Sequence, residues 1–398
     1  MYWMTIELKL LSEELLCSLR EQGYAGFDPF DGLNSRLFNF FQLQRSSFLR
    51  LAWLQVHKRL PINLRPLALV ARKRNPKGIA LFILGLVNDF KRTKEPSLLD
   101  EIASLCDWLL TQKQDVNKWG GACWGYHFPW QAKAFYVPEG KPNVITTVYC
   151  SRALQEASKL ALINSDKYRG FSLSSGEFIY KSLFSKDSQG LPYIAYIPDE
   201  KAFVHNASLW GAAWLLFSGK ELKKKEWISA AMEVVDRSVS AQGDGGEWVY
   251  GSLPHHQFID GFHTGYNLEA IKFVSKTLQT REYDACLDQG LRYYKENMIG
   301  PNGEPYYYNT KPYPYDVHSS SQIVLTLLRV GGTREDIALA AKVIDWTVQH
   351  MYLPKEKRFL YQINRLYKNK VNYVRWTQAW ACLMLSEWNL YESKKHVK

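Results

Sequence analysis

The stretch VHNASLWGAAWLLFSG, residues 204–219, opens with polar side chains and then becomes apolar on nearly every face. A helix that is apolar all round belongs in the interior, whereas a helix with one charged face belongs at the surface. The segment that follows, residues 223–241, has this second pattern, because charged residues are spaced among its apolar ones. Together the two segments predict a hairpin of one buried helix and one surface helix.

The same unit recurs along the chain. Five segments that open alike carry apolar anchor residues 55 to 60 residues apart, namely Val144, Val204, Phe262, Val317 and Val374. Amphipathic outer helices are expected at 165–184, 223–241, 281–298 and 333–351, and an earlier helix pair at 76–90 and 97–114. One more inner helix is expected either at 40–57 or at 373–391. A repeat of this length indicates a solenoid or a closed ring of hairpins.

The number of hairpins approaches six, which predicts an all-α fold, a closed (α/α)6 toroid. An open solenoid is the alternative, but its last repeat requires a polar outer face. The final apolar helix, residues 374–388, lacks such a face. We therefore expect one domain over residues 1–398, in which residues 1–35 form a helix and a loop that pack on the ring.

Loops rich in aromatic residues precede the inner helices. They read WGYHF at 124–128, LPYIAY at 191–196, EWVYG at 247–251, EPYYYN at 304–309 and RFLYQ at 358–362. Bulky residues beside Gly or Pro are typical of short strands and hairpins. All five loops should lie at one end of the toroid, which we call the mouth, where the inner helices also begin. Aromatic loops and helix N-termini at one mouth suit a binding site.

The composition limits the partners. Lys and Arg number 50 against 39 Asp and Glu, a formal charge of +11, which favours an anionic ligand. Nucleic acid is not expected, because no zinc-finger spacing, RNP-like sequence or basic helix interleaved with aromatics is present. An acidic polysaccharide suits the same charge. The six cysteines are scattered, and no stretch approaches the roughly 20 apolar residues of a membrane span. A cytoplasmic protein is expected.

Polar residues follow the anchors at equivalent repeat positions. They include His205, His263, His318 and Arg375. His and Arg are poor helix N-caps, so capping does not explain them well. A toroid would bring them around one opening. The sequence has no HExxH or other recognised ligand spacing, so neither a metal nor a cofactor is expected.

Carboxylates stand just before two of these helices. Asp260 precedes His263 and Asp316 precedes His318. Each suits an ordinary N-cap, and as a pair they also suit acid and base roles in glycoside cleavage. Asp28 and Asp31, in GFDPFDG at 26–32, belong either to the mouth or to a simple turn.

The chain resembles a family encoded beside bacterial exopolysaccharide and glycosyltransferase genes. The stretches that carry the resemblance are GFDPFDGLNS at 26–35, LPINLRP at 60–66, NPKGIALF at 75–82, WGYHFPWQ at 124–131, PNVITT at 142–147, VHNA at 204–207, FIDGFHTGYNLE at 258–269, YPYDVHSSSQ at 313–322 and VRWTQAW at 374–380. More distantly, the architecture is similar to glucuronyl carbon-5 epimerases, unsaturated glucuronyl hydrolases and toroid polysaccharide lyases. Such fold-level analogy raises the expectation of a carbohydrate ligand without assigning a reaction.

The expected function is modification of an exopolysaccharide or its lipid-linked precursor, with a uronic acid epimerised or undergoing elimination. His263 or His318 would be the base, Tyr266 or Tyr315 the acid, and Arg375 the partner of the sugar carboxylate. The catalytic candidates are His205, Asp260, His263, Tyr266, Tyr315, Asp316, His318 and Arg375. The substrate-binding candidates are Asp28, Asp31, Trp124, Tyr126, His127, Trp130, Asn206, Trp248, Tyr307, Trp376 and Gln378.

Three other functions stay open. A glycoside hydrolase would use Asp260 and Asp316 as its carboxylate pair. A glycan-binding or scaffold component would serve polymer assembly, in association with membrane-bound glycosyltransferase machinery. A toroid that binds a polyprenyl chain is disfavoured, because such a cavity should be purely apolar or carry metal-binding Asp clusters.

Overall fold

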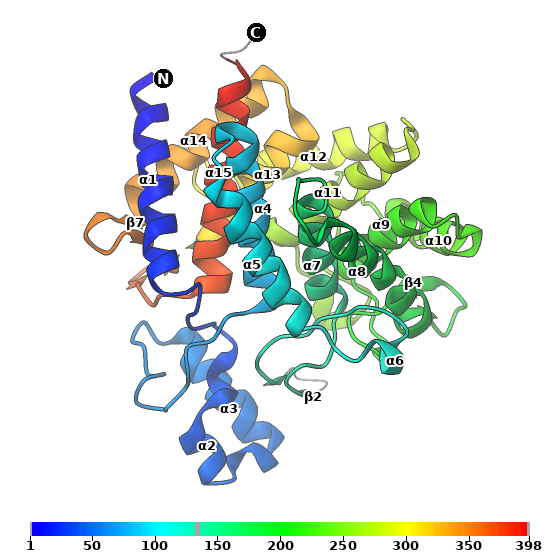
Figure 1. Cartoon of the computed structure of the whole chain (residues 1–398), viewed down its shortest axis with the longest axis horizontal. Coiled ribbons are helices and arrows are strands. Elements are labelled where there is room, and N and C mark those ends of the chain that lie inside the picture. Colours follow the sequence, from blue (N-terminus) through cyan, green and yellow to red (C-terminus); the bar gives the residue numbers. More distant parts are fainter. Residues whose placement is uncertain (1, 132–135, 396–398) are drawn as a thin grey trace.

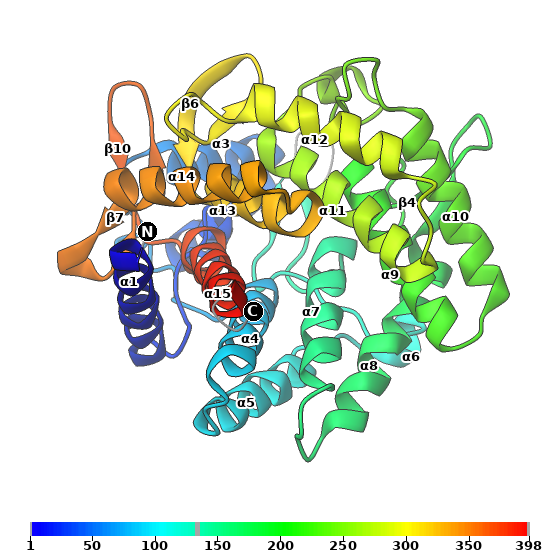
Figure 2. The same ribbon diagram turned by 90° about the horizontal axis from the view of Figure 1, so that it is seen from above.

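The computed structural model describes residues 2–131 and 136–395, whose helices form two concentric rings (Figures 1 and 2). The inner helices are α4 (Pro76–Thr93), α7 (Val144–Ala157), α9 (His205–Glu221), α11 (Gly261–Leu278), α13 (Val317–Thr326) and α15 (Ala379–Lys395). Each packs on the next, and α15 packs against α4. The ring is therefore closed, which confirms the toroid and excludes the open solenoid.

The outer helices cover the inner ring (Figure 2). They are α5 (Ser97–Thr111), α8 (Ser165–Phe178), α10 (Lys225–Ser240), α12 (Asp284–Met298), α14 (Arg334–Met351) and α1 (Tyr2–Glu21). Five of them follow their inner partner in the chain, whereas α1 packs against α15 (Figure 1). The first helix of the chain thus completes the last hairpin.

The segment proposed as a possible sixth inner helix, residues 40–57, lies outside the ring. It forms the end of α2 (Arg36–Phe40) and most of α3 (Ser47–Arg59). In α3 only Leu54 and His57 are buried, whereas Phe40 and Phe48 are exposed. Its apolar residues are therefore not arranged as those of a core helix, and the alternative at 373–391 is the correct one.

Short strands lie in the loops. β5 (Tyr306–Tyr308), β6 (Lys311–Asp316), β9 (Gln362–Ile363) and β10 (Lys368–Asn369) form an antiparallel sheet in the order β10-β9-β6-β5. The two-stranded pairs are β1 (Trp130–Gln131) with β2 (Tyr136–Val137), β3 (Phe184–Lys186) with β4 (Pro192–Ile194) and β7 (Tyr352–Leu353) with β8 (Arg358–Phe359). The strand expected at 124–128 does not form, since only Gly125 makes a bridge, to Pro142, and the strand expected at 247–251 does not form either. Only Gly251 makes a bridge there, because Trp248 turns into the core.

No helix in the described part of the chain combines the length and apolar character needed to cross a bilayer.

Candidate functional site

A cavity of about 470 Å³ opens at the end of the toroid where the inner helices begin. The second residue of every inner helical segment lines it, with the π-helical turn η7 (Val374–Gln378) opening the last one. These six residues are Lys77, Ile145, Asn206, Phe262, His318 and Arg375. The repeat therefore delivers one side chain per hairpin to a common centre. We call these residues the N2 ring.

His205 does not belong to this ring, because it is the first residue of α9. Successive helix residues point about 100° apart, so a shift of one position turns a side chain away from the cavity. The His205 ring packs on Phe203, and its Nδ1 lies 3.3 Å from Ser238 Oγ of α10. Burial lowers the pKa of His205 to about 4. The expectation that His205 faces the cavity is wrong, and Asn206 takes that place.

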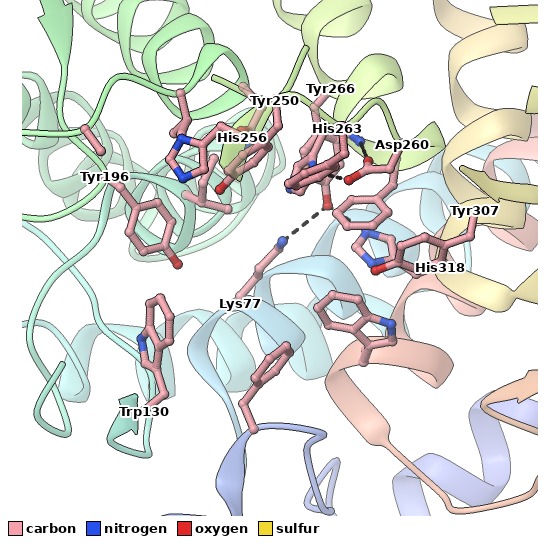
Figure 3. A pocket seen from close by; sticks show the side chains of 18 of the residues that line it. Lys77, Trp130, Tyr196, Tyr250, His256, Asp260, His263, Tyr266, Tyr307 and His318 are labelled. Atoms are coloured by element: carbon pink, nitrogen blue, oxygen red, sulfur yellow. Dashed lines mark hydrogen bonds and ion pairs between the residues drawn. The ribbon is translucent and has the colours of Figure 1, made fainter. Parts of the chain in front are cut away.

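Asp260 both caps α11 and holds His263. Its Oδ1 accepts from the His263 backbone N–H at 2.8 Å, and its Oδ2 lies 2.7 Å from His263 Nδ1. Asp260 is buried, whereas the His263 side chain keeps 21% of its surface exposed and lines the cavity. Figure 3 shows the contact of Asp260 with His263. With Nδ1 bound to the carboxylate, Nε2 is the nitrogen that remains for a ligand. A carboxylate in this position fixes the tautomer and orientation of an imidazole.

A second set of hydrogen-bonded polar side chains centres on Tyr266. Its hydroxyl lies 2.7 Å from His318 Nε2 and 3.4 Å from Lys77 Nζ. The His318 ring is stacked between Phe262 and Trp380, with centroids 4.8 and 4.4 Å away. Burial, followed by the charge of Lys77, lowers the pKa of His318 well below its usual value. His318 therefore stays neutral, while burial raises the pKa of Tyr266.

The Asp260–His263 pair and the set around Tyr266 meet in the cavity, since the ring centroids of His263 and Tyr266 lie 6.1 Å apart. Figure 3 shows Asp260, His263, Tyr266 and Lys77 together at the cavity. The arrangement offers an imidazole oriented by a carboxylate and, beside it, a phenol linked to an imidazole and an amine. Such groups can take up and return a proton.

Lys77 is a cavity residue that the sequence reasoning missed. It is 3% exposed, and its Nζ lies over the rings of Tyr149, Tyr266 and Trp380 at 4.7, 5.4 and 5.3 Å. No carboxylate of the described residues forms an ion pair with it. Burial, followed by the charge of Arg375, lowers its pKa well below 10.5. A signal was available, because a lysine at the start of the apolar helix 76–90 occupies the repeat position of His318 and Arg375.

Arg375 lines the cavity, but its charge is already paired. Its Nε and Nη2 donate to the two carboxylate oxygens of Asp28, the latter at 2.8 Å. Its guanidinium also lies 5.0 Å from the Tyr126 ring centroid. Asp28 itself does not line the cavity. It is therefore a partner of Arg375 and not the ligand contact that was expected.

Aromatic side chains make up much of the remaining wall. They are Phe30, Tyr126, Phe128, Trp130, Tyr196, Tyr250, Phe258, Tyr307, Tyr308 and Trp376. Tyr126, Trp130, Tyr307 and Trp376 are where the sequence placed them. Tyr196 and Tyr250 were missed as individuals, although their loops were identified as part of the mouth. Such walls suit the apolar faces of sugar rings, and polar tips remain for hydroxyl groups.

Trp124 and Trp248 cannot contact a ligand in this cavity. Trp124 is fully buried, and its indole N–H donates to Leu109 O at 2.8 Å. Trp248 is 2% exposed, and its indole N–H donates to Ser238 O at 2.9 Å. Each indole joins a loop to an outer helix. Their expected role in sugar binding is wrong, because both rings are buried in the packing within their hairpins.

Replacing Trp124 with Phe is therefore expected to lower the free energy of unfolding by about 1–2 kcal/mol, because Leu109 O loses its donor in the core. Glycan affinity should not change. Urea unfolding and a binding titration on the same variant test this. A loss of affinity with unchanged stability would return Trp124 to the site.

Four other candidates serve the scaffold. Asp31 accepts from Arg65 in a buried ion pair, and Gln378 binds both backbone groups of Phe359. The remaining two candidates, Tyr315 and His127, lie outside the cavity wall: the ring of Tyr315 packs on Trp346, and His127 Nδ1 lies 3.0 Å from Asn75 Nδ2.

Asp316 is close to the site but does not line it. Its oxygens accept from the His318 backbone N–H, from Gln362 Nε2 at 2.6 Å and from the indole of Trp376. Burial raises its pKa to about 6. It therefore caps α13 and positions Trp376. Among the described residues, no group of three or more His, Cys, Asp or Glu is arranged to hold a metal ion.

No family model matches the sequence, and no curated protein matches it. Solved structures are similar in fold. An unsaturated glucuronyl hydrolase specific for heparin is 12% identical, with a TM-score of 0.64 over 99% of this chain and 98% of that one. The cellobiose 2-epimerase of Bacillus thermoamylovorans is 11% identical, with a TM-score of 0.60 over 79% and 88%. An α-mannanase of family GH76 from Bacteroides thetaiotaomicron is 12% identical, with a TM-score of 0.61 over 81% and 88%. Identities this low establish the (α/α)6 toroid alone.

Proposed function

We propose that this protein is a carbohydrate-active enzyme that transfers a proton at a sugar carbon, by epimerisation or by elimination. The observation that carries the proposal is the meeting of Asp260–His263 with His318–Tyr266–Lys77 in one aromatic cavity. The folds of a sugar epimerase and of two glycoside hydrolases support a carbohydrate substrate. Fold analogy contributes no catalytic residue, so the chemistry is argued from the cavity.

In this proposal His263 is the base. Its Nε2 removes the proton from the carbon next to a carboxylate, and the C–H electrons move into that carboxylate to give an enediolate. Asp260 stabilises the imidazolium that forms. Tyr266 then gives its proton either to the same carbon, which completes epimerisation, or to the departing glycosidic oxygen, which completes elimination. The proton now held by His263 then leaves to solvent in the cavity, and a proton from solvent returns to the Tyr266 phenolate, which restores both groups. General acid–base steps of this kind contribute about 10²–10⁴-fold each.

A uronic acid is the substrate class that suits the charges. Lys58, Lys77 and Arg375 line the cavity together with Glu200 and Asp260. Since Asp28 already neutralises Arg375, we assign the sugar carboxylate to Lys77 instead. An ammonium beside the carboxylate would stabilise the charge that develops in the enediolate.

Hydrolysis by an Asp260–Asp316 pair has less support. Asp316 does not line the cavity, and hydrogen bonds from Gln362, Trp376 and the α13 backbone occupy it. Asp260 is occupied by His263. The resemblance of the motifs to exopolysaccharide-cluster proteins supports a bacterial exopolysaccharide or its precursor as the substrate in this proposal.

Incubation with uronate-containing and neutral oligosaccharides tests the proposal. Elimination yields an unsaturated uronate with new ultraviolet absorbance, and epimerisation leaves the mass unchanged but alters the NMR spectrum of one ring. Hydrolysis adds the mass of water. Binding without any of these changes would replace the enzyme by a glycan-binding module.

A further inference from the structure

Residues 36–74, which we call the excursion, leave the ring between α1 and α4. They form α2, α3 and their connections, which project beyond the ring in Figure 1. Lys58 of α3 lines the cavity, and α3 contacts β1. The excursion therefore borders the mouth of the toroid. Neither the ring nor the proposed chemistry accounts for its surface.

The excursion exposes an unusual number of large apolar side chains. They are Leu37, Phe40, Phe41, Phe48, Leu49, Val56, Leu60, Ile62, Leu67 and Leu69. Phe40 is 78% exposed, and Phe48 and Leu67 are each 75% exposed. Isolated exposed apolar residues are normal, but a concentration of them marks an interaction surface.

The same residues carry charge of only one sign. The excursion has no Asp or Glu but holds the basic residues Arg36, Arg45, Arg50, Lys58, Arg59, Arg65, Arg72, Lys73 and Arg74. Some of these have partners elsewhere, such as Arg65 with Asp31. Arg36, Arg45 and Arg59 are exposed, and no carboxylate in the described part of the chain pairs with them. Their charge is available to an external anion.

The β9–β10 hairpin extends this surface. Tyr367 donates to Arg59 O at 3.2 Å, and Asn369 donates to Leu60 O at 3.3 Å, so the hairpin lies against the end of α3. Leu366 at its tip is 91% exposed. The stretch 364–370, NRLYKNK, again contains basic but no acidic residues.

We propose that the excursion docks this protein on an anionic lipid membrane. Exposed Phe and Leu beside unpaired Arg form the combination that enters the headgroup region and attracts acidic lipids. The absence of carboxylates over the whole segment provides the charge complementarity, and nucleic acid would leave the apolar side chains without a partner. Docking would hold the cavity mouth beside the bilayer. The proposal does not depend on the reaction that the cavity performs.

Vesicle flotation tests the electrostatic part. The full chain should bind vesicles of phosphatidylglycerol and phosphatidylcholine, less as salt rises, and bind pure phosphatidylcholine far less. The variant Arg36→Gln/Arg45→Gln/Arg59→Gln should bind the anionic vesicles about 100-fold more weakly, from about 1 kcal/mol for each basic residue. The matched control Lys223→Gln/Lys224→Gln/Lys225→Gln removes three exposed charges beyond the C-terminal end of α9, and should bind normally.

The apolar part has its own pair of variants. Phe40→Ser/Phe48→Ser should weaken binding at least about 10-fold, whereas Ile163→Ser/Leu222→Ser, in the connections that follow α7 and α9, should not. All these side chains are exposed, and circular dichroism checks that each variant is folded. Absent binding by the wild type, equal binding to neutral vesicles, or equal losses in test and control variants would overturn the proposal. So would a dimer that Phe40→Ser/Phe48→Ser dissociates without any vesicle binding, since a second copy would then occupy the surface.

Discussion

Replacing His263 with Ala is expected to reduce kcat about 1000-fold with little change in glycan affinity, because the imidazole acts mainly in the transition state. The variant loses the cavity nitrogen that Asp260 orients through its 2.7 Å contact with Nδ1. Asp260→Asn should reduce kcat less severely, since the imidazole stays but its tautomer and charge are no longer stabilised. Single-turnover kinetics with a saturating oligosaccharide measure both effects.

His205 provides the matched control. It begins the neighbouring inner helix, yet its ring packs on Phe203 behind the cavity wall. His205→Asn should therefore leave kcat unchanged, apart from any loss of folded protein. If His205→Asn and His263→Ala impair turnover equally, the assignment of His263 as the base fails.

Replacing Lys77 with Met is expected to change stability and activity in opposite directions. The variant should lower kcat/KM about 100-fold, because the charge that meets the sugar carboxylate is lost. It should raise the free energy of unfolding at neutral pH by about 1 kcal/mol or more, since a buried amine without a carboxylate partner is removed. A residue that destabilises the fold while serving the site is typical of functional positions.

The stability gain should depend on pH. Because the pKa of Lys77 is lower in the folded chain than in the unfolded one, the unfolded chain holds this proton more tightly. The resulting destabilisation is complete below the folded pKa and disappears as pH rises toward 10.5. Denaturation of both proteins across alkaline pH should show their difference shrinking. Lys355→Met, at an exposed position, is the control. A less stable Lys77→Met variant with full activity would contradict this account.

The fold was predictable from the sequence because the inner helices are apolar all round and recur at near-constant spacing. A helix that is apolar all round must be buried, and in a closed ring the inner helices bury one another. The packing of α1 against α15 was harder to predict, since the sequence of an amphipathic helix does not show which helix it packs against. Residues 40–57 of the excursion were wrongly considered as an inner helix, because the sequence does not show that their apolar side chains face outward.

The site was predictable in outline but not in register. Anchoring the repeats by similarity placed Val204 one residue before α9 and Phe262 at the second position of α11. That slip of up to two residues selected His205 in place of Asn206, and helix ends are uncertain by about this much from sequence. The aromatic content of the loops also did not show which side chains line the cavity and which are buried in the core. Trp124 and Trp376 belong to similar loops, but only Trp376 reaches the cavity.

The exchange of a sugar carbon-bound proton with solvent tests the central claim most directly. In deuterated water the wild type, given its uronate-containing oligosaccharide, should place deuterium on the ring carbon beside the carboxylate if it epimerises, or remove the hydrogen from that carbon and leave an unsaturated ring if it eliminates, and His263→Ala should lose both changes. Turnover in which deuterium enters only hydroxyl groups and the mass of water is added would contradict the account, and would identify a hydrolase.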